Sequence, residues 1–282
     1  MFGTGLVPGL RLQLCLGIGL STIFSVLFET DLFSQSFRVE SQVCDVATSE
    51  MLAESLTLYD GGLALDFSYD LQSKEPREVI IYDSRKHQLI LLDYRRQVKL
   101  VLESYELVRM LEEQRRELAE NEDLSFLVDP QLREQMDLAA MTIELSNAHL
   151  TYRVTGQLPR DGSLLVPYYE YLDVFARLSV TDPQRLPPFT RIAVNQSLRK
   201  AGWIPAEVEL WIHSAALPRH RVHWKSQHHT GWTLSDADRQ RIEQAKRNWL
   251  GFKSVSLRDY RNLNPATLPA NSTTSTTSVK KP

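Results

Sequence analysis

Short apolar runs separated by polar turns dominate the middle of the chain and predict an antiparallel meander. The runs are Val79 to Tyr82, Leu89 to Leu92 and Val98 to Leu102, and each is too short for a helix. Polar breaks at Asp83 to His87 and at Asp93 to Gln97 separate them, as turns between neighbouring strands do. We therefore expect three consecutive antiparallel strands in this region.

A hairpin is expected just before the meander. Leu56 to Tyr59 and Leu63 to Tyr69 flank the tripeptide Asp60-Gly61-Gly62, and glycine accepts the positive φ angles of a tight turn. After the meander, apolar residues at helical spacing predict a helix over Tyr105 to Asn121, with its charged residues outside the apolar stripe. The middle of the chain therefore combines strands that neighbour one another with at least one amphipathic helix.

The same patterns predict the remaining elements. Further helices are expected over 129–140, where Asp129 and Pro130 would start the helix, over 166–180, with an aromatic face, and from Ser235 to Gly251. Ser235 is the expected N-cap of the last of these helices. The other expected strands cover 37–46, 141–145, 148–155, 189–196, 207–213, 219–227 and 255–257.

The two ends of the chain differ from this pattern. Leu12 to Phe28 is uncharged and mostly apolar, with Arg11 before it, which is the layout of a secretory signal. We expect residues 1–36 to be a signal peptide that leaves Phe37 as the first mature residue. An uncleaved membrane anchor through residues 12–28 is the alternative, and either places the protein in the periplasm or outside the cell. Residues 37–263 then form one domain, and 264–282, rich in Ser, Thr and Pro, is an expected disordered tail.

Composition narrows the classes of function. The formal net charge is −3, which does not favour binding to nucleic acid through phosphate contacts. After cleavage of the signal, Cys44 would be the only cysteine, so no intramolecular disulfide is expected. No nucleotide-binding or hydrolase motif is present, and we expect neither a cofactor nor enzymatic activity.

The motifs of the N-terminal half resemble a known family. An export signal is followed by LYDGGLALDF at Leu58 to Phe67, by VIIYDSRKHQLILLDYRRQVKLVL at Val79 to Leu102, and by a helix. This order resembles the LolA-like superfamily of extracytoplasmic lipoprotein carriers. The resemblance implies an α+β fold, in which a curved and mostly antiparallel sheet forms an incomplete β-barrel whose concave face is covered by helices.

The resemblance also implies a function, which is binding of a hydrophobic acyl or lipid ligand between sheet and helices. Burial of each methylene of such a ligand would contribute about 0.8 kcal/mol. The candidate pocket residues are Leu63, Leu65, Phe67, Ile81, Leu89, Leu91, Leu100, Tyr168, Tyr171 and Phe175. The alternative is that these side chains fill a core, and that the chain is an envelope scaffold or interaction protein that binds another envelope protein.

A metal-dependent enzyme is a second alternative. Five of the seven histidines, His213, His220, His223, His228 and His229, lie close together in the sequence, and imidazole is a common ligand of transition metals. His220, His223, His228 and His229 would be the ligands. However, strand alternation directs residues three apart to opposite faces, so a solvated strand and loop also explains the cluster.

Overall fold

The computed structural model describes residues 36–121, 124–182, 185–213 and 222–261. Within them the strands are β1 Phe37–Asp45, β2 Met51–Asp60, β3 Leu63–Tyr69, β4 Pro76–Asp83, β5 Gln88–Asp93, β6 Val98–Glu103, β7 Arg133–Asp137, β8 Thr142–Ser146, β9 Leu150–Gln157, β10 Ile204–Ile212, β11 Val222–Gly231 and β12 Lys253–Ser254. The α-helices are α1 Ser104–Ala119, α2 Leu165–Leu178, α3 Phe189–Ala201, α4 Asp236–Gly251 and α5 Leu257–Arg261.

All of these strands belong to one sheet. Their spatial order is β12-β6-β5-β4-β3-β2-β1-β11-β10-β9-β8-β7, and every pairing is antiparallel except that of the short β12 with β6. The sheet is not closed, because β12 and β7 lie at its two ends. The expected α+β class with a large, mostly antiparallel sheet is therefore confirmed.

The predicted hairpin and meander form the β2 to β6 half of the sheet. Asp60 pairs with Leu63 around Gly61 and Gly62, whose φ angles are 58° and 87°. β3, β4, β5 and β6 then pair in sequence order. The local turn signals were sufficient here because each strand finds its partner immediately along the chain.

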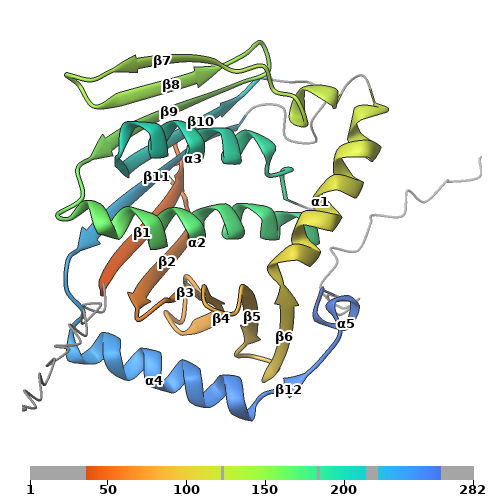
Figure 1. Cartoon of the computed structure of the whole chain (residues 1–282), viewed down its shortest axis with the longest axis vertical. Coiled ribbons are helices and arrows are strands. Elements are labelled where there is room, and N and C mark those ends of the chain that lie inside the picture. The colour runs from red at the N-terminus through yellow and green to blue at the C-terminus, as the bar shows by residue number, and fades with distance from the viewer. Residues whose placement is uncertain (1–35, 122–123, 183–184, 214–221, 262–282) are drawn as a thin grey trace, which may run out of the picture. The chain divides into compact units, whose positions relative to one another are not determined.

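Helices cover both sides of this half (Figure 1). We call the side that packs against α1, α2 and α3 the inner face, and the side that packs against α4 the outer face. On β5, Leu89 and Leu91 belong to the inner cluster, whereas Ile90 and Leu92 belong to the outer one. All four side chains are 0% exposed. Successive residues of a strand point to opposite faces, so the Leu89 to Leu92 stretch of β5 is apolar on both faces, between Gln88 and Asp93 at the ends of the strand.

The start of α4 is fixed by the expected cap. Ser235 accepts a hydrogen bond from the backbone amide of Asp238, and the Asp238 side chain accepts one from the Ser235 amide. Such a capping box satisfies two backbone donors that a helix end leaves free. Arg38 of β1 also donates to the Asp238 carboxylate at 2.9 Å. The cap therefore joins the helix to the sheet.

The predicted helix over 129–140 was wrong. The segment contains the edge strand β7, which pairs with β8. Gln131 has a φ angle of 42°, a conformation that a right-handed helix does not contain. The Asn147 side chain donates to the carbonyl of Pro130 at 2.6 Å and holds the start of the segment against the β8–β9 turn. Pairing with β8 therefore outweighs the helical propensity of these residues.

The predicted strand over 189–196 was also wrong, because this segment begins α3. Val194 and Leu198, four residues apart on one helix face, are buried in the inner layer, while Phe189 packs with Leu111 and Val128. Gly202 ends the helix with a φ angle of 70°. At 255–257, the short strand β12 comes earlier, at Lys253–Ser254, and α5 begins at Leu257.

Two predictions concern the ends of the chain. Residues 1–35 of the expected signal or anchor, and the expected tail 264–282, lie outside the described residues. Among the helices that are described, none combines the length and the apolar character needed to cross a membrane.

Double coverage of the sheet makes a prediction about stability. We expect Leu89→Ala and Ile90→Ala each to lower the free energy of unfolding by about 2–5 kcal/mol, because each removes a fully buried side chain from a different layer. Val101→Ala on neighbouring β6, at 39% exposure, is the matched control and should cost less than about 1 kcal/mol. Urea unfolding measures all three variants. A cost near the control value for either buried residue would contradict the two-layer core.

Candidate functional site

The sheet opens between β10 and β11. These strands pair from Ile212 and Val222 as far as Glu207 and Gln227, where their ladder stops. Both strands continue beyond that point. β10 reaches Ile204 while paired with β9, and β11 reaches Gly231 while paired with β1. A hollow therefore lies where a continuous sheet would bring the two strands together.

The entry of the chain into β10 explains the opening. After Gly202 ends α3, Trp203 turns into the inner core and is only 5% exposed. Its ring lies against Gly156 of β9, where an added Cβ atom would be 2.7 Å from the ring. A register irregularity between Pro205 and Glu207 follows, and such bulges bend a strand away from its partner. β10 thus starts on the inner side and joins β11 only from Glu207 onward.

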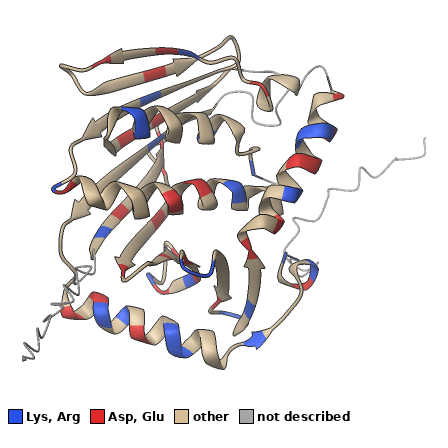
Figure 2. Cartoon of the chain, viewed as in Figure 1, with Lys and Arg blue, Asp and Glu red and all other residues tan. Residues whose placement is uncertain are grey.

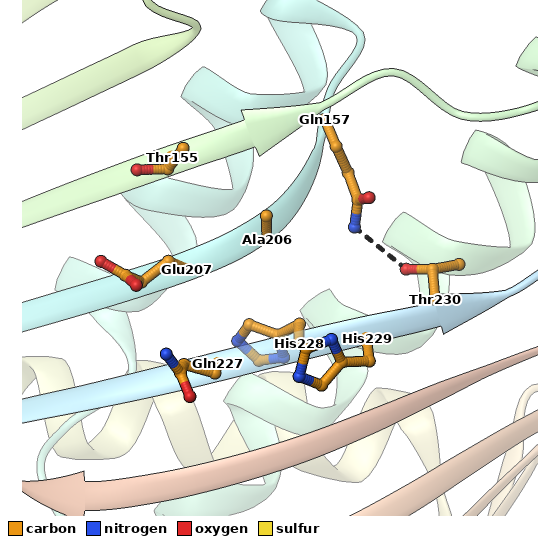
Figure 3. A pocket seen from close by; sticks show the side chains of 8 residues that line it. All are labelled: Thr155, Gln157, Ala206, Glu207, Gln227, His228, His229 and Thr230. Carbon is orange, nitrogen blue, oxygen red and sulfur yellow. Dashed lines mark hydrogen bonds between the residues drawn. The ribbon is translucent and has the colours of Figure 1, made fainter.

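The lining of the hollow is polar. Its volume is about 410 Å³, and the lining residues are Thr155, Gln157, Ala206, Glu207, Gln227, His228, His229 and Thr230 (Figure 3). The Gln157 side chain donates to the Thr230 hydroxyl at 3.1 Å across the opening. Amides, hydroxyls and imidazoles can each donate or accept hydrogen bonds. The lining therefore offers several hydrogen-bonding groups.

His228 is held between two hydroxyl groups. Its Nδ1 lies 2.8 Å from the Ser41 Oγ of β1, and its Nε2 lies 3.0 Å from the Ser226 Oγ. Removal from solvent lowers the pKa of His228 from 6.5 to about 3, and the positive Arg191 and neighbouring His229 contribute in the same direction. The imidazole is neutral at neutral pH, and with so low a pKa it is a weak general base.

Charged side chains on the outer face beside the hollow are paired with one another. Lys225 of β11 contacts Glu207 at 2.7 Å and Glu209 at 3.4 Å. The hydrogen bond to Glu207 is the main cause that raises the pKa of Lys225. Arg153 of β9 contacts Glu144 of β8 at 2.9 Å. These pairs connect β8 with β9 and β10 with β11 at the sheet surface.

An aromatic stack lies among these pairs. The Trp211 and His223 rings are 4.6 Å apart, and the Arg153 guanidinium lies 5.5 Å from the Trp211 ring centre. His223 Nε2 is 3.5 Å from a Glu209 oxygen. The outer face of β8 to β11 is thus a polar surface whose charges are largely paired within the chain.

The structure does not gather the predicted histidine cluster. By strand alternation His223 and His229 point to the outer face, whereas His228 points to the inner face and contacts Ser41. His213 follows the end of β10, and His220 lies outside the described residues. Among the residues that are described, no group of three or more His, Cys, Asp or Glu side chains could hold a metal ion.

The structure also divides the predicted ligand-binding residues between two layers. Leu63, Leu65, Phe67 and Ile81 pack in the outer cluster with α4, while Leu89, Leu91, Leu100, Tyr168, Tyr171 and Phe175 pack in the inner cluster. The sheet itself separates the two groups. The ten residues therefore cannot line one pocket, because the two groups point to opposite faces of the sheet.

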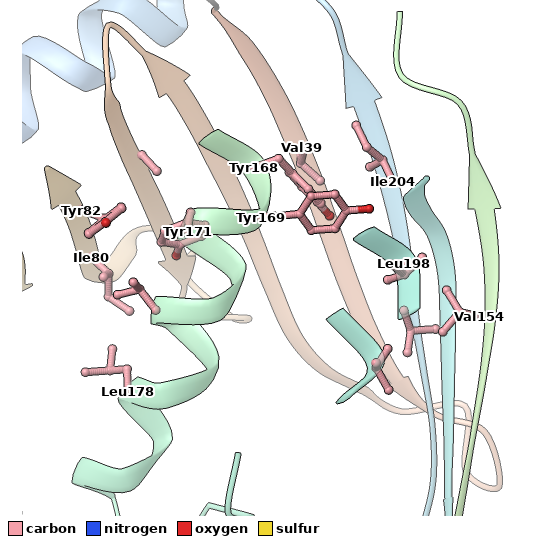
Figure 4. Close-up of a cluster of buried hydrophobic side chains, with 14 of the residues drawn as sticks. Val39, Ile80, Tyr82, Val154, Tyr168, Tyr169, Tyr171, Leu178, Leu198 and Ile204 are labelled. Atoms are coloured by element: carbon pink, nitrogen blue, oxygen red, sulfur yellow. The ribbon is translucent and has the colours of Figure 1, made fainter. Parts of the chain in front are cut away.

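Aromatic rings fill the inner layer where α2 crosses the sheet (Figure 4). Phe37 and Tyr59 stack with ring centres 4.1 Å apart, and Tyr168 and Tyr171 of α2 lie 5.9 and 6.0 Å from Tyr59. All four residues are at most 2% exposed. Ring contacts at these distances are typical of a packed core.

A buried carboxyl group lies beside this aromatic cluster. Asp66 of β3 is 4% exposed and accepts a hydrogen bond from the Thr57 hydroxyl at 2.7 Å. The pKa of Asp66 is raised from 3.8 to about 6, mainly by burial and also by the nearby Glu78 carboxylate. Hydrogen bonds with the Thr57 and Ser55 hydroxyls act in the opposite direction and lower the pKa. Asp66 therefore changes its charge close to neutral pH within an apolar layer.

Sequence reasoning missed the hollow. Its residues are scattered over three strands, and no motif connects Gln157 with Thr230. The available signals were Gly202, as a helix end, and Pro205, which cannot donate to a strand ladder. Because 189–196 was predicted as a strand, neither residue indicated the end of a helix or an interrupted strand ladder.

Comparisons with known proteins leave the family open. No family model matches the chain, and no curated protein matches it significantly. The crystal structure of an uncharacterized conserved protein from Thermus thermophilus is similar at 10% sequence identity with a TM-score of 0.34. The match covers 79% of this chain and 91% of that chain. A TM-score this low carries no inference about fold or function.

The position of Asp66 predicts a pH dependence of stability. The folded pKa of about 6 is above the ordinary 3.8, so the folded state retains this proton when the unfolded chain has released it. The free energy of unfolding should therefore fall as the pH rises between these values, by an amount on the order of 3 kcal/mol.

Asp66→Asn keeps the shape of the protonated carboxyl group and removes its titration. Urea unfolding at pH 4 should give similar stability for both proteins. At pH 7 the variant should be the more stable by up to about 3 kcal/mol. Equal pH profiles for the two proteins would show that Asp66 does not titrate in this range.

Proposed function

We propose that this chain is an exported, non-enzymatic binding protein that holds an extended segment of a protein partner in the hollow between β9, β10 and β11. The observation that carries the proposal is the contrast between this hollow and the interior. The hollow is lined by polar side chains, whereas the predicted ligand-binding residues are buried in two separate apolar layers.

The proposal keeps the architecture implied by the resemblance to LolA-like carriers. We infer that the sheet is a curved, incomplete barrel and that α1, α2 and α3 cover its concave face. In a carrier of this kind the ligand would occupy the space between sheet and helices. Here Tyr168 and Tyr171 of α2 contact Tyr59 directly, which favours a filled interior and binding elsewhere.

An extended polypeptide fits the hollow because its two sides are strands. Residues 204–206 of β10 and 228–231 of β11 follow the end of their common ladder, and each stretch is still paired on its other side. Peptides that bind beside strands use main-chain hydrogen bonds for affinity and side-chain contacts for specificity. Gln157, Gln227 and Thr230 supply neutral donors and acceptors at this position.

The same geometry favours binding over catalysis. Glu207 is the only carboxylate among the described residues of the lining, and it forms an ion pair with Lys225 at 2.7 Å. His228 is neutral and weakly basic. Covalent or acid-base catalysis would require an activated nucleophile close to a strong base. The described residues of the lining offer hydrogen bonds but do not include such a pair.

Lipid content distinguishes this proposal from acyl-chain transport. Protein purified from its native compartment should contain no stoichiometric lipid when its organic extract is measured by mass spectrometry. A lipid present at about one per chain would support the carrier function and overturn the proposal.

Site-specific photo-crosslinking tests the hollow itself. A photoreactive amino acid at His229, introduced into the chain in its native host, should give one discrete protein adduct. The same amino acid at Gln240, which is exposed on α4 on the outer face, is the matched control and should not.

A variant that fills the hollow tests whether the adduct depends on it. Thr155→Arg places a large side chain in the hollow and should remove the adduct, while circular dichroism confirms the fold. An adduct that persists with Thr155→Arg, or that forms equally from position 240, would contradict binding in the hollow.

A further inference from the structure

The strand β7 ends the sheet and has one open edge. All five of its residues are exposed, and it pairs with β8 on one side only. Within the described part of the chain, no strand lies beyond it (Figure 1). An open edge presents a row of backbone donors and acceptors that another strand can pair with.

The sequence of this edge is complementary to itself. Charged residues occupy both ends of β7 (Figure 2). Arg133, Gln135 and Asp137 share one face by strand alternation. If two copies of β7 pair antiparallel about a twofold axis through Gln135, Arg133 of each copy lies opposite Asp137 of the other. Twofold symmetry forms this charge pair twice and places the two Gln135 side chains opposite each other.

The two charges are available for such pairs. Arg133 forms no ion pair or side-chain hydrogen bond with any described residue, in contrast to Arg153 and Lys225 on the same face of the sheet. Asp137 uses one oxygen, Oδ1, to accept from the amides of Ala139 and Ala140. Its second oxygen is therefore free to accept from a guanidinium.

We propose that β7 is a dimerisation edge at which a second copy of this chain adds antiparallel, centred on Gln135, and continues the sheet from one protomer into the next. Five residues make a small interface, so the dimer should form reversibly and depend on concentration. The hollow at β10 and β11 is separate from this edge, and the two proposals can fail independently.

Charge reversal tests the pairing. In sedimentation velocity the chain, purified from cells that express the full sequence, should form dimers as its concentration rises. Arg133→Asp places like charges opposite each other in the homodimer, and so does Asp137→Arg. Each variant should raise the dissociation constant at least about tenfold.

Sedimentation of a mixture of the two variants is the decisive measurement. In a mixed dimer the acidic edge of one variant faces the basic edge of the other, so a mixture should dimerise although neither variant does alone. This rescue also excludes misfolding as the cause of the loss. A wild-type chain that stays monomeric to its solubility limit, or a mixture that shows no rescue, overturns the proposal.

Cysteine crosslinking tests the register. In a background with Cys15→Ser and Cys44→Ser, Gln135→Cys should form a disulfide-linked dimer under mild oxidation, because directly opposed residues have Cβ atoms on the order of 5 Å apart. Arg133→Cys is the matched control, since it would face Asp137 and not its own copy. Equal crosslinking at both positions would exclude a twofold axis at Gln135.

Discussion

The constraint on which the rest of the structure depends is that strands β2 to β5 must be buried on both faces. In β4 and β5 apolar residues occupy successive positions, as in Leu89 to Leu92, and a strand with this pattern is stable only between two covering layers. β2 and β3 are buried on both faces as well, with Thr57 and Asp66 among their buried residues. The N-terminal half of the chain provides the strands but only α1 to cover them. α2 and α3 complete the inner layer and α4 supplies the outer one, so the C-terminal half completes the fold that the N-terminal half requires.

α4 covers only part of the outer face of the sheet, and the polar surface lies on the part that α4 does not cover. The outer cluster includes side chains from β2 to β5, whereas the outer face of β8 to β11 carries Glu144, Arg153, Glu209 and Lys225 in cross-strand pairs. On these strands the inner positions, such as Val154 and Val208, remain apolar and buried. One sheet therefore contains a doubly buried half and a half with one polar face.

This division explains which predictions succeeded. Alternation and turn signals located the meander and the hairpin, since both depend on neighbours in sequence. They could not assign Leu65 and Leu89 to different layers, because Leu89 to Leu92 contains no polar position that would distinguish one face of β5 from the other. β7 and α3 were assigned wrongly for a related reason. The conformation of β7 depends on pairing with β8, and that of α3 depends on the packing of Val194 and Leu198. Local propensity gives no information about either contact.

The candidate site could not be predicted for a further reason. The hollow exists because the β10–β11 ladder ends at Glu207 while the β1–β11 ladder continues to Gly231. Such a difference in register is a property of three strands together and has no counterpart in the residues of any one of them. Among the described strands, pairing is interrupted at the opening beside β10 and is absent along the outer edge of β7, and these are the two places at which we propose binding. The first offers neutral hydrogen-bonding side chains and the second offers complementary charges, so the two positions suit different partners within one architecture.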